Sequence, residues 1–143
     1  MKMQCVLEIS LKKIKSNWEK INIHSNFKAS AVVKANAYGF GLEEISLALS
    51  QSGCNFFYVA QIEEAIKLRQ SLKSNKIKIA ILEGMLYHPE EYKKNNLIPV
   101  INNLNQLNNF IKFKKLSPKI KSILHIDTGM NRLGLDKNEL ELV

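Results

Sequence analysis

The stretch from Ala31 to Gly41 reads "AVVKANAYGFG", and it joins a short apolar run to a loop. Its first three residues are small or β-branched, the fourth is Lys34, and the next seven positions hold one tyrosine and two glycines. Apolar runs bounded by turn residues are typical of strands. The pattern therefore predicts a strand over 27–33 whose end delivers a lysine into a loop over 34–41.

The alternation of strand and helix continues along the chain. Further apolar runs predict strands over 56–60, 77–84, 97–101 and 121–127. Pro99 argues against the fourth strand, because proline cannot donate to a sheet ladder. Apolar residues at three- and four-residue steps predict a helix capped by Ser10 and helices over 42–53 and 104–111. Glu63 and Glu64 suit the N-terminal end of a helix dipole and predict a helix over 61–71, and Pro89 at a first helical position predicts one over 88–94. Strands that are apolar on both faces and alternate with helices indicate a parallel sheet covered by helices.

The spacing of these units indicates a fold class. Strand starts recur at roughly 20 to 27 residues, so eight units would fill the roughly 250 residues usual for a (β/α)8 barrel. The sequence holds five predicted strands, and Asp136 followed by Glu139 has the capping spacing that opens one more helix. We therefore expect an α/β fold, a partial (β/α)8 TIM barrel of about five βα units with an N-terminal helix, truncated from a longer ancestor.

The composition of the 143 residues is that of one globular domain, with 45% hydrophobic and 24% charged residues. The formal charge of +8 comes almost entirely from lysine, which accompanies abundant asparagine and isoleucine, as codon bias would produce. No apolar run of about 18 residues predicts a membrane span, and the polar N-terminus predicts a cytoplasmic protein. Cys5 and Cys54 lack a CxxC partner, which favours reduced thiols without a metal.

Candidate chemical groups follow the first and fifth predicted strands, where barrel active sites form. Lys34 follows the first, and Asp127, Thr128, Asn131 and Arg132 follow the fifth. Partial desolvation lowers the pKa of a lysine and frees its amine to form a Schiff base with an aldehyde, commonly pyridoxal phosphate. On the residues alone, a solvated surface lysine beside an ordinary glycine turn stays an open alternative.

Two long motifs carry a resemblance to a known family. "VVKANAYGFG" and "HIDTGMNRLG" stand in that order about 90 residues apart, after an opening "LEISLKKIKSNW". Together they resemble the N-terminal part of bacterial alanine racemase, a fold-type III pyridoxal phosphate enzyme that interconverts L- and D-alanine to supply peptidoglycan precursors. The resemblance implies that residues 1–143 are an incomplete cofactor-binding barrel domain and that the family's C-terminal β-domain is absent.

The resemblance also implies roles for four residues. Lys34 would bind pyridoxal 5'-phosphate and act as the base on the D-alanine face, and Tyr38 would donate its hydroxyl to the cofactor phosphate. Arg132 would lie near the cofactor's phenolic oxygen and the substrate carboxylate, and the backbone of Met130 would help to bind alanine. No metal is implied.

Two positions depart from the family pattern. His125 stands where many relatives have a lysine that can be carbamylated, and a neutral imidazole cannot replace that negative charge beside Arg132. We interpret His125 as a packed histidine at the end of a strand. Phe40 replaces the histidine usual between the two glycines, and we expect this change to affect packing more than chemistry.

The opposite-face base of the family is a tyrosine of the C-terminal domain, contributed across the dimer, so we expect this chain to be inactive alone. Five strands cut from a barrel leave two unpaired edges, which predicts self-association or a complementary C-terminal fragment. The alternatives are one half of a split racemase, a degenerate remnant, and a basic nucleic-acid-binding protein. The last would use the lysines at 112, 114, 115, 119 and 121, a run better explained as a solvated helix end, so neither nucleic acid nor membrane is expected.

Overall fold

The structure is a computed structural model that describes residues 5–85 and 89–142. Helices and strands alternate through most of this part of the chain. In chain order they are α1 (Leu11–His24), β1 (Ala31–Val32), α2 (Lys34–Tyr38), α3 (Leu42–Gln51), β2 (Phe56–Val59), α4 (Ile62–Leu72), β3 (Lys78–Ile81), α5 (Pro89–Lys94), β4 (Ile98–Ile101), α6 (Leu104–Leu116), β5 (Ile123–Leu124) and α7 (Lys137–Leu140). No helix of the described residues is long and apolar enough to cross a membrane.

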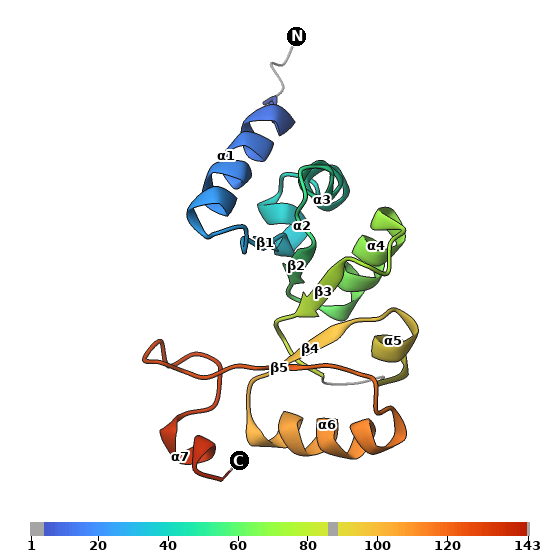
Figure 1. Ribbon diagram of the computed structural model, residues 1–143, viewed down its shortest axis with the longest axis vertical. Helices are drawn as coiled ribbons and strands as arrows, with labels where there is room; N and C mark the ends of the chain where they lie inside the picture. The colour runs from blue at the N-terminus through green and yellow to red at the C-terminus, as the bar shows by residue number, and fades with distance from the viewer. Residues whose placement is uncertain (1–4, 86–88, 143) are drawn as a thin grey trace.

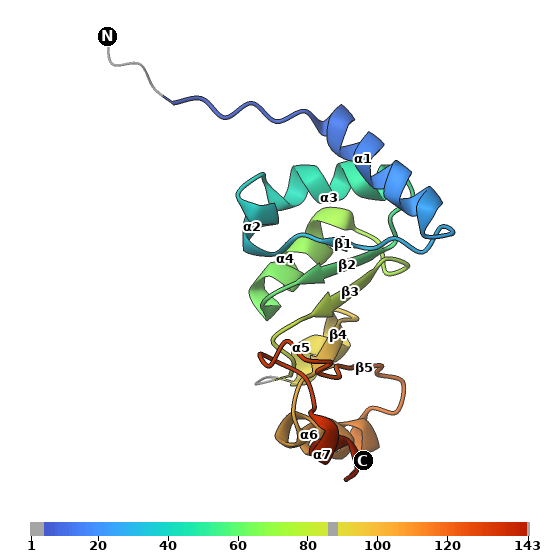
Figure 2. The same cartoon turned by 90° about the vertical axis from the view of Figure 1, so that its left-hand side faces the viewer.

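The strands form one parallel sheet whose spatial order is the chain order, β1-β2-β3-β4-β5. Figures 1 and 2 show this order directly, since the colour passes steadily from blue at one end of the molecule to red at the other. A doubly wound sheet would reverse its strand order part of the way through. The uninterrupted order instead belongs to part of a (β/α)8 barrel, which confirms the expected fold class.

The core lies between the sheet and its helices. Phe57 and Val59 of β2 and Ile79 and Ile81 of β3 are almost completely buried, whereas Phe56 and Tyr58 on the other face of β2 are only half-buried. Alternate side chains of a strand point to opposite faces. Burying each large apolar side chain contributes about 1.5–3 kcal/mol, so the helix-covered face provides much of the stability.

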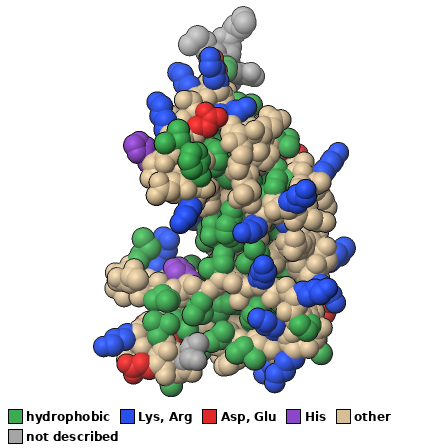
Figure 3. All heavy atoms as spheres, viewed as in Figure 1, with side chains coloured by type: hydrophobic (Ala, Val, Ile, Leu, Met, Phe, Trp, Pro, Cys, Tyr) green, Lys and Arg blue, Asp and Glu red, His purple; other side chains and the backbone are tan. Residues whose placement is uncertain are grey.

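The molecule is hollowed on one side. In Figure 3 apolar side chains form the floor of this hollow, and Lys or Arg and His side chains lie around its edge. Comparison with the ribbon in the same view places the hollow between the N-terminal elements and the loop that follows β5 (Figure 1). The barrel-like curvature therefore leaves an open face beside the predicted functional groups.

The predicted elements are present, and their bounds differ in detail. β1 and β5 each have only two residues, although strands were predicted over 27–33 and 121–127, because each lies at a sheet edge with one neighbouring strand. Pro99 lies inside β4, opposite Ile81 of β3, so the argument against this strand was wrong. Proline is tolerated here because its ring is buried in the core, where it adds apolar contact.

The predicted helix caps are confirmed. The Ser10 side chain accepts a hydrogen bond from the backbone N–H of Lys13 at the start of α1. At α7 the Asp136 and Glu139 side chains form a reciprocal capping box. Pro89 is the first residue of α5, as expected, while His88 at the predicted start of that helix lies outside the described residues.

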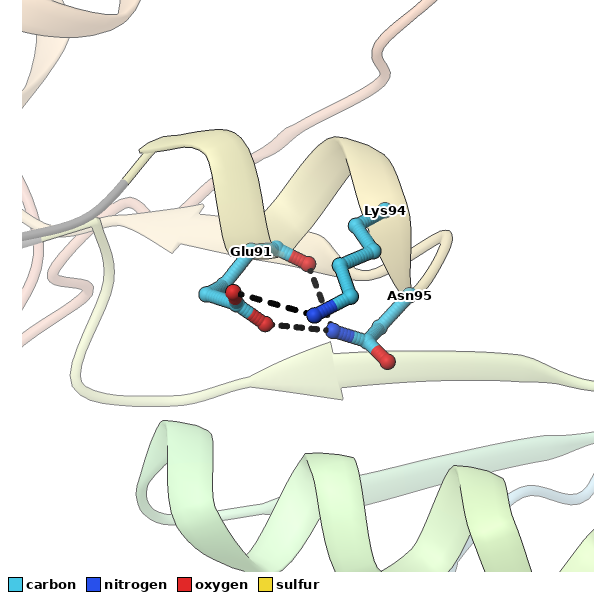
Figure 4. Close-up of polar contacts among 3 residues, drawn as sticks. All are labelled: Glu91, Lys94 and Asn95. Carbon is cyan, nitrogen blue, oxygen red and sulfur yellow. Dashed lines mark hydrogen bonds and ion pairs between the residues drawn. The ribbon is translucent and has the colours of Figure 1, made fainter.

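A polar network connects α4 with the turn after α5, away from the carboxyl ends of the strands. The buried guanidinium of Arg69 donates to the backbone carbonyls of Ser74, Ile77, Asn95 and Asn96. Figure 4 shows how the turn itself is held: the Asn95 amide donates to the backbone and side-chain oxygens of Glu91 at 3.0 and 2.9 Å, beside Lys94. These contacts satisfy helix-end carbonyls, so we assign this network to the fold.

Candidate functional site

The turn that follows β1 has a left-handed backbone. Ala35, Asn36, Ala37 and Tyr38 have φ angles of 51°, 55°, 53° and 56°, so α2 is a left-handed turn and not an α-helix. This conformation costs roughly 1–2 kcal/mol for each residue with a Cβ. The sequence predicted only a loop here, because no propensity rule favours left-handed alanine. Strained backbone that persists indicates a functional constraint, which makes this turn the first candidate.

Hydrogen bonds within the left-handed turn and at its end hold it in place. Inside it, the N–H of Ala37 donates to the carbonyl of Val33 at 2.9 Å, and the N–H of Gly39 donates to Ala35 at 3.0 Å. At its end, the side-chain oxygen of Asn36 accepts from the N–H of Leu42 at 2.9 Å and so caps α3. These bonds offset part of the strain of the left-handed turn.

A carboxylate of the next βα unit contacts the residue beside Lys34. One oxygen of Glu64 accepts from the N–H of Ala35 at 2.6 Å, and the other accepts from the N–H groups of Ala60 and Gln61 at 2.8 and 3.3 Å. The last bond is half of the capping box that opens α4. The sequence indicated only a favourable helix-dipole interaction for Glu64, so this contact was missed.

The loop that follows β5 is held mainly by its own atoms. The Asp127 carboxylate accepts from the N–H groups of Gly129 and Met130, both at 2.9 Å. These bonds, that of Gly129 foremost, lower the pKa of Asp127. Two backbone bonds close the loop, each at 2.9 Å. The N–H of Asp127 donates to the carbonyl of the fully buried Leu135, and the N–H of Leu135 donates to the carbonyl of His125. The predicted loop "TGMNRLG" is confirmed.

His125 has a polar partner at the end of the neighbouring strand. Its Nδ1 lies 2.8 Å from Oδ1 of Asn102, whose amide nitrogen donates to the carbonyls of Leu82 and Val100 at 2.7 and 3.2 Å. Because the amide nitrogen is committed to these carbonyls, Oδ1 is the atom that faces the ring, and we assign the Nδ1–H tautomer to neutral His125. The position of Asn102 after β4 was the sequence signal for this pair, and it was overlooked.

The predicted residues share the carboxyl end of the sheet but occupy opposite edges. Lys34 is half-buried after β1, and Tyr38 in the same turn is 60% exposed. Met130, 74% exposed, and Arg132 lie in the loop after β5, the other edge strand. Phe40 is 48% exposed, and its expected effect on packing stays a prediction. The main contacts of α2 are with α3 and β2, and within the described residues no hydrogen bond joins the two groups.

The available donors suit an anionic aldehyde. Lys34 carries a primary amine, Tyr38 a hydroxyl and Arg132 a guanidinium, the groups that bind an aldehyde carbon, a phosphate and a carboxylate respectively. Within the described residues no group of three His, Cys, Asp or Glu side chains is placed to hold a metal. Burial raises the pKa of the Cys54 thiol, which makes this cysteine an unreactive core residue.

A basic cavity lies at the other end of the strands. Its volume is about 700 Å³, and it is lined by the starts of β2, β3, β4 and β5 together with Lys76, Lys78, Lys93, Lys119 and Lys121. Lys34 does not line it. In βα-barrels the reacting groups collect at the carboxyl ends of the strands, so we do not place the candidate site in this cavity.

Comparisons with known proteins identify a family to which the chain is similar. A family model described as "Alanine racemase, N-terminal domain" matches residues 9–143. The chain is 44% identical over 140 residues to an alanine racemase of Rickettsia prowazekii (strain Madrid E). The matched region covers 96% of this chain and 34% of that protein. The chain thus spans about a third of the length of this curated relative.

Solved structures show the same similarity. The crystal structure of alanine racemase from Bartonella henselae with covalently bound pyridoxal phosphate has a TM-score of 0.87 and 39% identity, over 94% of this chain and 38% of that one. The biosynthetic alanine racemase from Pseudomonas aeruginosa has a TM-score of 0.73 and 32% identity, over 92% and 37%.

Proposed function

Because the chain belongs to the alanine racemase N-terminal domain family, we propose that it forms the lysine side of an alanine racemase active site. The observation that carries the proposal is the strained left-handed turn that begins directly after Lys34. The covalently bound pyridoxal phosphate of the Bartonella henselae relative supports the same cofactor for this chain. Alanine is then the proposed substrate.

We propose that Lys34, Tyr38, Arg132 and Met130 divide the work of this site. The Lys34 amine would hold the cofactor covalently and then move a proton to or from the α-carbon on one face of alanine. The Tyr38 hydroxyl would donate to the cofactor phosphate, and the Arg132 guanidinium would orient the substrate carboxylate together with the Met130 backbone. Pyridoxal phosphate, when bound, supplies the electron sink that stabilises negative charge at the α-carbon.

Racemisation needs a second proton-transfer group on the opposite face of the α-carbon. Among residues 1–143 we assign one such group, Lys34, so we expect these residues alone to show no racemase turnover. A complementary polypeptide would have to supply the other group. The cytoplasmic location predicted from the N-terminal sequence stays a prediction.

The test is covalent labelling of the purified chain. The protein is incubated with pyridoxal phosphate, reduced with borohydride and digested, and the modified lysines are located by mass spectrometry. Subtracting Arg69 and Arg132 from the 21 basic residues leaves 19 lysines, and we expect Lys34 to be labelled in preference to the other 18. Lys34→Ala should abolish the selective label, while Lys28→Ala, which removes an exposed lysine just before β1, should leave it unchanged. Scattered labelling that is identical in both variants would refute the proposed cofactor site.

A further inference from the structure

We infer that Glu64 is a positioning residue for Lys34, an inference that rests on the function proposed above. The Glu64 carboxylate bridges two βα units: Oε1 accepts from the N–H of Ala35, the residue after Lys34, and Oε2 accepts from the N–H of Ala60, which directly follows β2. The bridge joins the carboxyl ends of two adjacent strands at the point where the lysine leaves the sheet.

Lys34 is anchored on both sides by the second βα unit. Before it, the N–H of Val33 donates to the carbonyl of Tyr58 in β2 at 2.8 Å. After it, the N–H of Ala35 donates to Glu64 in the first turn of α4 at 2.6 Å. The bond at Ala35 orients the peptide plane between Lys34 and Ala35, and the bond at Val33 holds the backbone one residue before Lys34. Together they restrict the direction in which the Lys34 side chain leaves the backbone.

The bond at Ala35 also selects the left-handed turn. Ala35 is the first of the four consecutive residues with positive φ, and a charged acceptor at its N–H stabilises this conformation more than a neutral acceptor would. Without the carboxylate, the peptide between Lys34 and Ala35 would be free to rotate toward the ordinary right-handed region. The Lys34 amine would then no longer have one fixed orientation in the site.

Glu64→Gln separates the positioning role from the capping role. The amide keeps one acceptor oxygen and replaces the other with an NH₂ donor. If the remaining oxygen keeps the two N–H groups of Ala60 and Gln61, the NH₂ group faces the N–H of Ala35 and cannot accept from it. The matched control is Glu63→Gln in the same helical turn, where Glu63 is exposed and makes no hydrogen bond among the described residues.

The experiment measures two quantities in the full chain and both variants. Amide hydrogen exchange by NMR reports the protection of the Ala35 N–H, with the Phe57 N–H in the core as the internal reference. Reductive labelling with pyridoxal phosphate then reports the ratio of Lys34 modification to modification of the other lysines. We expect Glu64→Gln to lower both the Ala35 protection and the labelling ratio by about tenfold or more, and Glu63→Gln to change neither.

Each outcome decides the inference. An unchanged labelling ratio in folded Glu64→Gln, whether or not Ala35 loses protection, overturns the positioning role while the cofactor site stands. A wild-type chain without preference for Lys34 overturns the proposed function and this inference together. If Glu64→Gln does not fold, Glu64→Asp replaces it, because the shorter side chain keeps a carboxylate for the α4 cap but withdraws it from Ala35. The same tenfold loss is then expected.

Discussion

The turn after β1 and the loop after β5 lie at the same end of the sheet but are held in different ways. Bonds from Glu64 and Tyr58, in the second βα unit, hold the first around Lys34. The second is held by bonds among residues 125–135, centred on the Asp127 carboxylate. A local network keeps a loop in shape, whereas bonds from another element also place it relative to the sheet. The lysine side of the proposed site is therefore the better positioned of the two.

Gly134→Ala is expected to have the largest effect, because it breaks the loop after β5 at its closing point. Gly134 has a φ of +105°, and an added Cβ would lie 2.7 Å from the backbone nitrogen of Asp127. We expect the free energy of unfolding to fall by about 3 kcal/mol or more, from strain and overpacking together. Urea denaturation followed by circular dichroism measures the loss.

Gly129→Ala is the matched control for that variant. Gly129 also has a positive φ, +124°, but nothing lies within 4 Å of an added Cβ. Only the backbone strain remains, and we expect a loss of about 1–2 kcal/mol. Equal losses in the free energy of unfolding for the two variants would show that the close approach of Gly134 to the Asp127 backbone adds nothing to the cost of a Cβ at that position.

A second pair of variants compares the two regions directly. Asn36 and Asn131 both have a φ of 55°. The Asn36 side chain accepts from the N–H of Leu42 in α3, while the Asn131 side chain, within the described residues, donates only to the nearby Gly129 carbonyl at 3.3 Å. Because a helix cap is lost, Asn36→Ala should lower the free energy of unfolding by about 1–2 kcal/mol. Asn131→Ala should change it by less than about 0.5 kcal/mol. Thermal denaturation of both variants measures these losses. Equal losses in the free energy of unfolding would contradict the comparison.

The smallest effect is expected from pH at Asp127. Hydrogen bonds from the backbone, that of Gly129 foremost, lower its pKa in the folded state. The stabilisation they provide is therefore present above the unfolded pKa of about 4, and it is lost as the pH falls through the lower folded value. The amide signals of Gly129 and Met130 should shift in this acidic range in an NMR titration. Asp127→Asn should abolish that shift, and a shift that persists in the variant would assign the titration to another group.

Short-range features were predictable from the residues. The Ser10 cap and the Asp136–Glu139 capping box depend on contacts three residues apart, and both are present as expected. The apolar runs also predicted five strands and their parallel arrangement, since burial of both faces leaves a distinct pattern. The order of the strands in the sheet followed from the regular spacing of the units and is confirmed.

Contacts between distant residues were not predictable in the same way. The lengths of β1 and β5 depend on which strand lies beside each of them, and apolar runs do not carry that information. Pro99 was interpreted from its missing N–H alone, although burial in the core outweighs that loss. The pairing of His125 with Asn102 joins residues that are 23 positions apart, and the position of Asn102 after β4 indicates it only once β4 and β5 are known to be neighbours.

For the proposed site, the chain's residues marked Lys34 as a candidate and predicted the loop that follows it, because strand ends and glycines are local signals. The handedness of that turn and the role of Glu64 depend on the packing of one βα unit against the next. Glu64 lies 29 residues beyond Ala35, and its carboxylate reaches that N–H only because β1 and β2 lie side by side in register. The direction in which Lys34 leaves the sheet is thus a property of the folded sheet, since the bonds on both sides of it come from a different part of the chain.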